Sequence, residues 1–340
     1  MTEAMFYHQE NDKLICDLCP HRCRISNGQV GICGVRKNEA DKLISLSYGR
    51  ICAANVDPIE KKPLFHFLPS SLSFSIATPG CNFRCQFCQN WQISQIKEGI
   101  LRAEQISACE IVELAKKYEC SSISYTYTEP TIFYEFALEC SVLAKEKNLA
   151  NIFVTNGYIN PEPLKKIAPY LDAANVDLKA FREKTYRDVC GGSLKPVLET
   201  ISLMYSLGIW LEVTTLIIPG VNDSPEELGD IAEFIASLNV DIPWHISAFH
   251  PDYRMLDKKP ASLQTLLEAE VIGRKAGLRY VYIGNVTREA NTYCPSCGML
   301  LVRRIGFNVL ENYLSINDGR CPNCSFEVRG IWINSIGKHG

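Results

Sequence analysis

Residues 73–91 read SFSIATPGCNFRCQFCQNW, and this stretch decides the fold of the chain. Its first six residues are mostly apolar and β-prone, as expected for a buried strand. The loop behind them holds Cys81, Cys85 and Cys88 in a C-x3-C-x2-C spacing, with Phe87 just before the last cysteine. Three thiolates can hold three irons of a cubane cluster, and the fourth iron then keeps an open coordination position. The segment therefore predicts a strand followed by a loop that carries a reactive metal centre.

An alternation of apolar runs and amphipathic stretches continues from this segment to about residue 285, which is the pattern of βα units in a parallel sheet. The further expected strands are 121–126, 151–155, 173–178, 210–218, 243–247 and 279–283. Such an α/β chain closes most easily into a full or partial TIM-type (β/α) barrel, although a doubly wound open sheet has the same local pattern. Polar residues just beyond several strand ends favour the barrel, because barrel enzymes have their active sites there.

Helix starts between these strands carry their own signals. Ser107 with Glu110 predicts a capping box, in which each side chain satisfies a backbone donor at the helix start. Ser224 with Glu227 predicts a second capping box, before the stretch LGDIAEFIASL.

The composition is that of one large domain with small additions, since 46% of the 340 residues are hydrophobic and 21% are charged. A net charge of -3, with no basic run interleaved with aromatics, favours neither a nucleic-acid nor a membrane partner. The first residues lack a signal-peptide pattern, and no run approaches the length of a membrane span. We therefore expect a cytoplasmic protein in which eleven of the sixteen cysteines, those that fall into three groups, bind metals, because a reducing compartment disfavours disulfides.

A second cysteine group lies near the C-terminus. Cys294 and Cys297 form one C-P-x-C knuckle, and Cys321 and Cys324 form another. Two such knuckles at this spacing predict a closed tetrathiolate site for zinc or rubredoxin-type iron. The expected role of the metal is to hold a small ribbon folded.

A third cysteine group lies near the N-terminus. Cys16, Cys19, Cys23 and Cys33 form a C-x2-C-x3-C-x9-C set, and His21 could replace one of the four. Either zinc or an auxiliary [4Fe-4S] cluster fits four thiolates, and the spacing does not choose between them.

The C-x3-C-x2-C loop with its aromatic residue resembles the radical SAM superfamily. A zinc knuckle is the plain alternative, but the nearby stretch offers neither a histidine nor a fourth cysteine. The resemblance implies that S-adenosylmethionine (SAM) chelates the open iron, and that one electron cleaves it to methionine and a 5'-deoxyadenosyl radical. It also implies a reductant such as flavodoxin or ferredoxin, while the protein orients SAM and excludes water.

The resemblance extends to residues that follow the later strands. Glu129 in TYTEP is similar to the position whose carboxylate accepts a hydrogen bond from the SAM ammonium group. Further positions resemble SAM-contacting or site-lining residues of the glycyl-radical-enzyme activases, and Asn285 would lie near the adenine or ribose. The expected cofactor-binding residues are Phe87, Glu129, Asn156, Asp177, Lys179, His250 and Asn285. Turns, solvated strand ends and caps are the structural alternatives for most of them.

The resemblance covers nearly the whole chain and is most specific for one subgroup. The stretches CDLCPHRC (16–23), GICGVR (31–36), NVDPIEKKPLFHFLP (55–69) and YTYTEPTIF (125–133) resemble the radical SAM member of the AmmeMemoRadiSam system, a pyruvate formate-lyase activating enzyme homologue. It implies a Memo-like protein and an AMMECR-type protein as partners. On this basis we expect a cysteine-rich metal-binding segment at 1–60, a radical SAM barrel at 61–290 and a ribbon-like module at 291–340.

Three functions remain open from the sequence. The first is a SAM-cleaving enzyme that abstracts hydrogen from an unidentified substrate, such as a small molecule or RNA. The second is activation of a glycyl-radical enzyme, although activases carry Gly-Gly where this chain has Tyr127-Thr128. The third is a non-catalytic iron-sulfur electron carrier or scaffold, which predicts no SAM binding.

Overall fold

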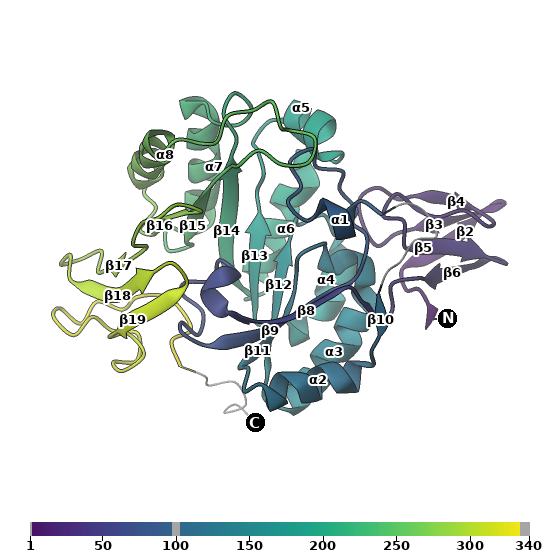
Figure 1. The fold of residues 1–340 in the computed structure, drawn as a ribbon, viewed down its shortest axis with the longest axis horizontal. Coiled ribbons are helices and arrows are strands. Elements are labelled where there is room, and N and C mark those ends of the chain that lie inside the picture. The colour runs from purple at the N-terminus through teal and green to yellow at the C-terminus, as the bar shows by residue number, and fades with distance from the viewer. Residues whose placement is uncertain (1, 97–102, 334–340) are drawn as a thin grey trace.

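The computed structural model describes residues 2–96 and 103–333, and one curved eight-stranded sheet forms its centre (Figure 1). The strands lie in the order β16, β15, β14, β13, β12, β11, β9, β8. Neighbours pair in parallel except β8, which runs antiparallel to β9. Their bounds are Ala53–Pro58 (β8), Leu72–Ala77 (β9), Ser122–Tyr125 (β11), Ala150–Thr155 (β12), Ala173–Asp177 (β13), Trp210–Ile217 (β14), Trp244–Ala248 (β15) and Val281–Gly284 (β16). Among the described residues β8 does not pair with β16, so the sheet is a partial TIM-type barrel.

All seven expected parallel strands are present, and their bounds differ from the predicted ones by at most two residues. Strand β8 was not expected. It lies at the edge of the sheet and exposes three consecutive residues, 54–56, so its sequence lacks the alternation that marks a half-buried strand. The central sheet therefore begins at Ala53, before the expected boundary at residue 60.

The longer helices connect consecutive parallel strands and cover one face of the sheet. Because the parallel strands follow chain order without reversal, right-handed crossovers place these helices on the same side. Their bounds are Ala108–Lys117 (α2), Tyr134–Glu146 (α3), Pro161–Ile167 (α4), Leu194–Ser206 (α6), Pro225–Leu238 (α7) and Leu263–Lys275 (α8). Short turns of helix are Trp91–Ser94 (α1), Glu183–Thr185 (α5), the 3-10 helices Ile59–Lys61 (η1), Pro130–Phe133 (η2) and Ala168–Tyr170 (η3), and the π-helix Tyr186–Cys190 (η4). None of the helices in the described ranges has the length and apolar character needed to cross a membrane.

The two predicted capping boxes have different outcomes. Ser107 and Glu110 form the expected reciprocal pair at the start of α2. Ser224 caps α7 by accepting from the Glu227 backbone N–H at 3.2 Å, but the second box is wrong. The Glu227 carboxylate instead accepts from the Phe181 backbone N–H at 2.6 Å, because the loop after β13 packs beside the start of α7.

The register of β9 and β11 positions the functional loop. Ile76 lies opposite Tyr125, so both strands end at the same level. The cysteine loop, residues 78–91, leaves β9 at that level and passes beside Thr126–Thr128. The Thr128 hydroxyl donates to the Thr78 carbonyl at 2.8 Å, which joins the two strand ends.

Small sheets flank the barrel at both ends of the chain (Figure 1). The N-terminal strands are Thr2–Glu3 (β1), Tyr7–Glu10 (β2), Lys13–Cys16 (β3), Arg24–Ser26 (β4), Arg36–Glu39 (β5) and Lys42–Ser45 (β6). They form two three-stranded sheets, β1-β6-β5 and β2-β3-β4. Arg50–Ile51 (β7) pairs with Glu104–Gln105 (β10), and the C-terminal module contains Thr292–Tyr293 (β17), Leu300–Ile305 (β18) and Asn308–Asn312 (β19).

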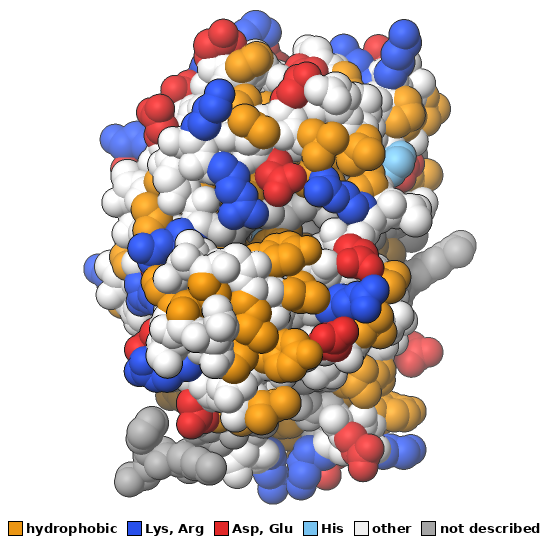
Figure 2. Space-filling model, turned by 90° about the vertical axis from the view of Figure 1, so that its left-hand side faces the viewer, with side chains coloured by type: hydrophobic (Ala, Val, Ile, Leu, Met, Phe, Trp, Pro, Cys, Tyr) orange, Lys and Arg blue, Asp and Glu red, His pale blue; other side chains and the backbone are white. Residues whose placement is uncertain are grey.

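The face that carries the C-terminal module shows a gathering of hydrophobic side chains (Figure 2). Large apolar side chains of the module remain solvent-exposed, namely Tyr293, Ile305, Phe307, Leu310 and Ile316. On its other side the module packs on the barrel, where the buried Arg304 donates to the Phe65 carbonyl at 2.6 Å.

Candidate active site and metal centres

The cysteine loop lines a cavity at the carboxyl ends of the parallel strands. Cys81, Cys85 and Cys88 all border this cavity, whose volume is about 270 Å³. Cys81 and Cys85 are buried, while Cys88 is half-buried. Backbone groups hold the loop around them, since the Phe83 N–H donates to the Cys81 sulfur at 3.4 Å. The three thiols therefore face a common space in which an external group can meet them.

A second element, distant in sequence, supports the loop from behind. The π-helix η4 accepts two backbone hydrogen bonds from the loop, Arg84 N to Cys190 O at 2.7 Å and Gln86 N to Val189 O at 3.0 Å. Cys190 is fully buried, and its side chain, together with burial, raises the pKa of the Cys85 thiol well above its ordinary value.

Asn156 lies at the centre of a polar network on the cavity wall. Its side-chain N–H donates to the Asn82 side-chain oxygen at 2.8 Å and approaches the Cys81 sulfur at 3.8 Å. The side-chain oxygen of Asn156 accepts from the Tyr158 backbone N–H at 2.9 Å, which holds the side-chain amide in one orientation. Asn156 therefore makes a local turn and also lines the cavity.

Asp177 and Lys179 both line the cavity beside the cysteine loop. The Lys179 ammonium pairs with the Asp177 carboxylate at 2.8 Å and lies 5.7 Å from the centre of the Phe87 ring. Burial alone would lower the pKa of Lys179, but Asp177 and the neighbouring thiols of Cys85 and Cys190 outweigh it and raise that pKa well above its usual value. The side chain therefore stays cationic beside sulfur ligands that become anionic when they bind iron.

Two further expected residues reach the cavity, and one does not. Phe87 and Asn285 line it. His250 is exposed and does not border it, and its closest polar contact is 3.4 Å to the Asn285 backbone oxygen. The structure therefore places His250 outside the group formed by the other expected side chains.

Glu129 is fully buried and is not among the residues that line the cavity, and its contact with SAM stays a prediction. One carboxylate oxygen accepts from the Thr131 backbone N–H at 3.0 Å and from the hydroxyls of Thr131 and Thr155 at 2.6 and 2.8 Å. The other accepts from the Asn156 backbone N–H at 2.8 Å. Both oxygens are thus engaged by neighbouring groups, so Glu129 fixes the position of Asn156.

A charged group that was not expected from the sequence forms another wall. Lys62 is buried and donates to Asp57 at 2.7 Å, and the Tyr127 hydroxyl donates to the same carboxylate oxygen. Burial lowers the pKa of Lys62 to about 8, although Asp57 opposes the shift. Lys62 and Tyr127 line the cavity, and the left-handed backbone of Tyr127 (φ 67°) is the local sign of an unusual position.

The residues around the cavity fit a [4Fe-4S] cluster and SAM. Burial raises the pKa of the Cys81 thiol well above its ordinary value, so this group becomes a thiolate only when a metal binds it. Three cysteines and no histidine line the cavity among the described residues, which leaves one iron of a cubane without a protein ligand. Polar side chains on the remaining walls can bind the amino acid and nucleoside parts of SAM.

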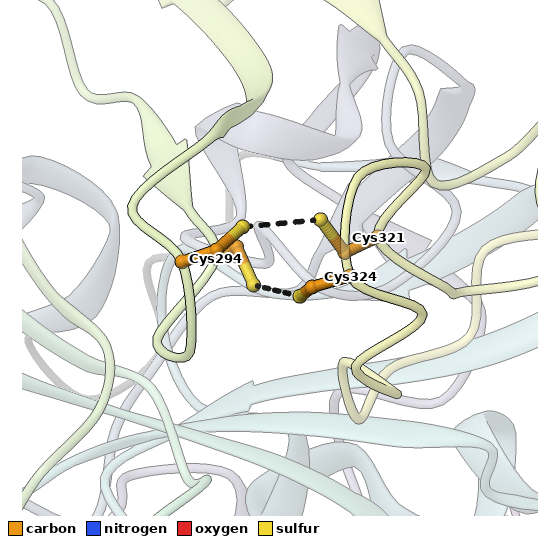
Figure 3. A group of neighbouring side chains, drawn as sticks. Cys294, Cys321 and Cys324 are labelled. Atoms are coloured by element: carbon orange, nitrogen blue, oxygen red, sulfur yellow. Dashed lines mark hydrogen bonds between the residues drawn. The ribbon is translucent and has the colours of Figure 1, made fainter.

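The C-terminal cysteines form a compact metal site. Cys294 and Cys324 have sulfurs 3.6 Å apart, as do Cys297 and Cys321, and all four sulfurs lie within 4.8 Å of one another. Figure 3 shows the thiols of the two knuckles facing each other. Four thiolates at about 2.3 Å from a single ion lie about 3.8 Å apart, so this group can hold one zinc or one rubredoxin-type iron.

The N-terminal cysteines also converge. Cys16, Cys19, Cys23 and Cys33 line one small pocket, the N-terminal pocket, between β3, β4 and the turn before β5. His21 lines the same pocket, but its Nε2 is 2.7 Å from the Asn82 backbone oxygen. The pocket therefore borders the segment that carries Cys81.

Comparison with known proteins agrees with this geometry. A family model described as the radical SAM superfamily matches residues 75–235. An uncharacterized protein of Methanocaldococcus jannaschii is 46% identical over 332 residues, covering 96% of this chain and 99% of that protein. The pyruvate formate-lyase-activating enzyme of Streptococcus mutans is 23% identical over 190 residues, covering 53% of this chain and 72% of that enzyme.

Solved structures share the fold at low sequence identity. Streptococcus suis SuiB bound to S-adenosylmethionine matches with a TM-score of 0.52 and 14% identity, covering 78% of this chain and 71% of that chain. A radical SAM methyltransferase from Sphaerobacter thermophilus matches with a TM-score of 0.52 and 17% identity, covering 69% of this chain and 71% of that chain. At these identities the likeness shows the shared fold alone.

Proposed function

Because the chain belongs to the radical SAM superfamily, we propose that it cleaves S-adenosylmethionine reductively at a [4Fe-4S] cluster held by Cys81, Cys85 and Cys88. When bound, the cluster and SAM supply one-electron chemistry that yields methionine and a 5'-deoxyadenosyl radical, which abstracts hydrogen from the substrate. The protein's own residues bind, orient and shield these groups.

The observation that supports this proposal most is the shared cavity. Three thiols border the same space as Asn156, Asp177, Lys179 and Asn285, although these side chains come from different strand ends. We propose that Asn156 orients SAM beside Cys81, since its amide is held by three neighbours. Lys179 offers positive charge beside the thiolates, and Asn285 lies where the nucleoside part can bind.

Quantifying 5'-deoxyadenosine tests the proposal directly. The protein is reconstituted with iron and sulfide under anaerobic conditions, reduced with dithionite and incubated with SAM. We expect product from the wild type and from Cys109→Ala, a matched control because Cys109 is exposed on α2. Cys85→Ala should lose both the cluster and the product, because one of the three iron ligands is missing.

Two outcomes would contradict the proposal. One is a wild-type protein with an intact cluster that yields no 5'-deoxyadenosine, which would favour an electron carrier or scaffold. The other is product formation that survives in Cys85→Ala, because the cleavage would then occur away from the cysteine loop.

Activation of a glycyl-radical enzyme is a second candidate, favoured by the similarity to an enzyme named as the pyruvate formate-lyase activator of Streptococcus mutans. Against it stands Tyr127, whose side chain lines the cavity where activases carry glycine. Electron paramagnetic resonance distinguishes the two: a glycyl radical formed on pyruvate formate-lyase in the presence of this protein and SAM would support activation.

We also propose that the protein works with the partners implied by its subgroup. These are a flavodoxin or ferredoxin as electron donor, and Memo-like and AMMECR-type proteins of the AmmeMemoRadiSam system. The exposed apolar face of the C-terminal module is compatible with association. We keep the cytoplasmic location as part of the same proposal, because reduced thiols are needed at all three cysteine groups.

A further inference from the structure

The N-terminal pocket encloses little free space but four thiols. Its volume is about 10 Å³, and Cys16, Cys19, Cys23 and Cys33 all border it. A backbone hydrogen bond from Cys16 N to Cys23 O, at 3.0 Å, closes the loop that carries three of them. Four thiols that line one pocket suit a metal group bound directly to their sulfurs.

The spacing of the sulfurs separates two kinds of metal group. In the described part of the chain, the four C-terminal cysteines have ligand atoms that all lie within 4.8 Å of one another. No three of the N-terminal thiols meet that condition, although they share a pocket. A single ion draws its four thiolates together, whereas in a cubane each thiolate binds a different iron and the sulfurs lie farther apart.

A buried cation faces the same pocket with unused donors. Arg36 lines the N-terminal pocket and is 1% exposed. Its Nη2 donates to the Met5 carbonyl at 2.9 Å and to the Glu135 carboxylate at 2.5 Å, but its Nε and Nη1 have no hydrogen-bond partner in the described structure. Buried donors are almost always satisfied, so these two point to a missing acceptor.

We propose that Cys16, Cys19, Cys23 and Cys33 hold a second [4Fe-4S] cluster, and that Arg36 donates hydrogen bonds to its sulfur atoms. Four thiolates on such a core carry net negative charge, which the buried guanidinium group of Arg36 balances. Zinc is the alternative that the sulfur spacing disfavours.

The position of the pocket gives this cluster a role in electron supply, a step that rests on the proposed function. Asn82 borders the N-terminal pocket and follows Cys81 directly in the chain. Its backbone oxygen contacts His21, and its side chain accepts from Asn156, which also contacts the Cys81 sulfur. One electron from a low-potential flavodoxin or ferredoxin enters the second cluster and passes to the cluster on the cysteine loop, and no bond forms or breaks in this transfer.

The test measures iron, acid-labile sulfide and zinc in anaerobically reconstituted full-length chains. The triple variant Cys81→Ala, Cys85→Ala and Cys88→Ala cannot hold the first cluster, so we expect it to retain about four irons and four sulfides per chain. After reduction it should show the paramagnetic resonance of a [4Fe-4S]⁺ centre. Adding Cys19→Ala and Cys23→Ala to the triple variant leaves two thiols at the N-terminal pocket, so it should remove the sulfide and the paramagnetic resonance together.

Several results would overturn the proposal. The triple variant could contain no sulfide, or it could contain a second zinc in place of iron. Retention of metal at the C-terminal cysteines reports that the variant is folded, since that site needs no sulfide. If the triple variant does not fold, the double variant Cys19→Ala, Cys23→Ala decides: loss of about four sulfides relative to the wild type supports the second cluster, and an unchanged content refutes it.

This test is independent of SAM cleavage. The sulfide content of the triple variant is measured without SAM, whereas the proposed function is tested by 5'-deoxyadenosine from the wild type. A protein that makes no 5'-deoxyadenosine but keeps sulfide in the triple variant would refute the function and leave the second cluster standing.

Discussion

Glu129 illustrates how a single buried carboxylate positions the wall of the site. Four donors from Thr131, Thr155 and Asn156 surround its two oxygens, and burial raises the pKa of the carboxyl while these hydrogen bonds oppose the shift. One of the donors is the backbone of Asn156, whose side chain contacts Cys81. The residue therefore acts on the cavity through Asn156 and is a positioning residue.

Replacing Glu129 by Gln tests this role. The amide places an N–H where a carboxylate oxygen now accepts a hydrogen bond, so we expect the free energy of unfolding to fall by about 1–3 kcal/mol. Anaerobic urea unfolding measures the change, with Glu113→Gln as the control because Glu113 is exposed on α2. A variant that keeps its stability and loses only SAM affinity, measured by equilibrium binding, would show that Glu129 binds SAM itself.

At the scale of elements, the π-helix η4 and the glycines behind it support the cysteine loop. Two loop N–H groups donate to η4 carbonyls, and Gly191 ends the π-helix in the left-handed conformation (φ 77°). Gly192 lies so close to the Phe83 ring that a Cβ there would overlap it. The loop that carries the iron ligands is therefore shaped by a segment about a hundred residues later.

The substitution Gly192→Ala should disturb the loop without touching a cysteine. The added methyl group displaces the Phe83 ring, and overpacking of this kind costs about 1–3 kcal/mol. We expect less iron and sulfide bound after reconstitution and a lower yield of 5'-deoxyadenosine. Gly229→Ala in α7 is the control, since nothing lies within 4 Å of its Cβ position. Wild-type iron content in Gly192→Ala would argue against this support.

At the scale of the whole molecule, residues 63–69 join the barrel to the C-terminal module. Leu68 N donates to Ile331 O at 2.6 Å, and Ile331 N donates to His66 O at 2.7 Å. The His66 ring is fully buried between the Arg329 backbone oxygen at 2.9 Å and the Tyr282 hydroxyl at 2.7 Å. Burial lowers the pKa of His66 to about 4, so the ring is neutral in the folded protein.

His66 should make the protein sensitive to acid. Below pH 6.5 the unfolded chain binds a proton at this residue, while the folded protein does so only near pH 4. Stability contributed by the neutral ring is therefore present above pH 6.5 and is lost as pH falls to 4, by about 3 kcal/mol in total.

Urea unfolding of His66→Gln between pH 7 and 4.5 measures this contribution. We expect the variant to lose less stability on acidification than the wild type, and the exposed control His250→Gln to behave like the wild type. The metal sites are common to all three proteins, so the difference between their pH profiles isolates the histidine. Identical profiles for His66→Gln and the wild type would contradict the assignment.

Local patterns were enough to predict much of the fold and part of the site. The seven parallel strands were predictable because a strand buried on both faces is a short apolar run, and this signal does not depend on distant residues. The C-terminal metal group was predictable because two cysteines separated by two residues in a knuckle already share one small space. The edge strand β8 was missed because its exposed residues show no alternation. The second capping box was predicted wrongly, because packing against the loop after β13 decides the partner of Glu227.

The sequence by itself determined the chemistry available to this protein, namely three groups of thiols and the alternating elements that carry one of them to a strand end. Only the tertiary structure decided which side chains share a space. It placed Lys62 and Tyr127 in the cavity, left His250 outside, put Glu129 behind the wall and set the N-terminal pocket beside Asn82. The physical reason is that ligand spacing is a local property of the chain, whereas burial and contact depend on how distant segments pack.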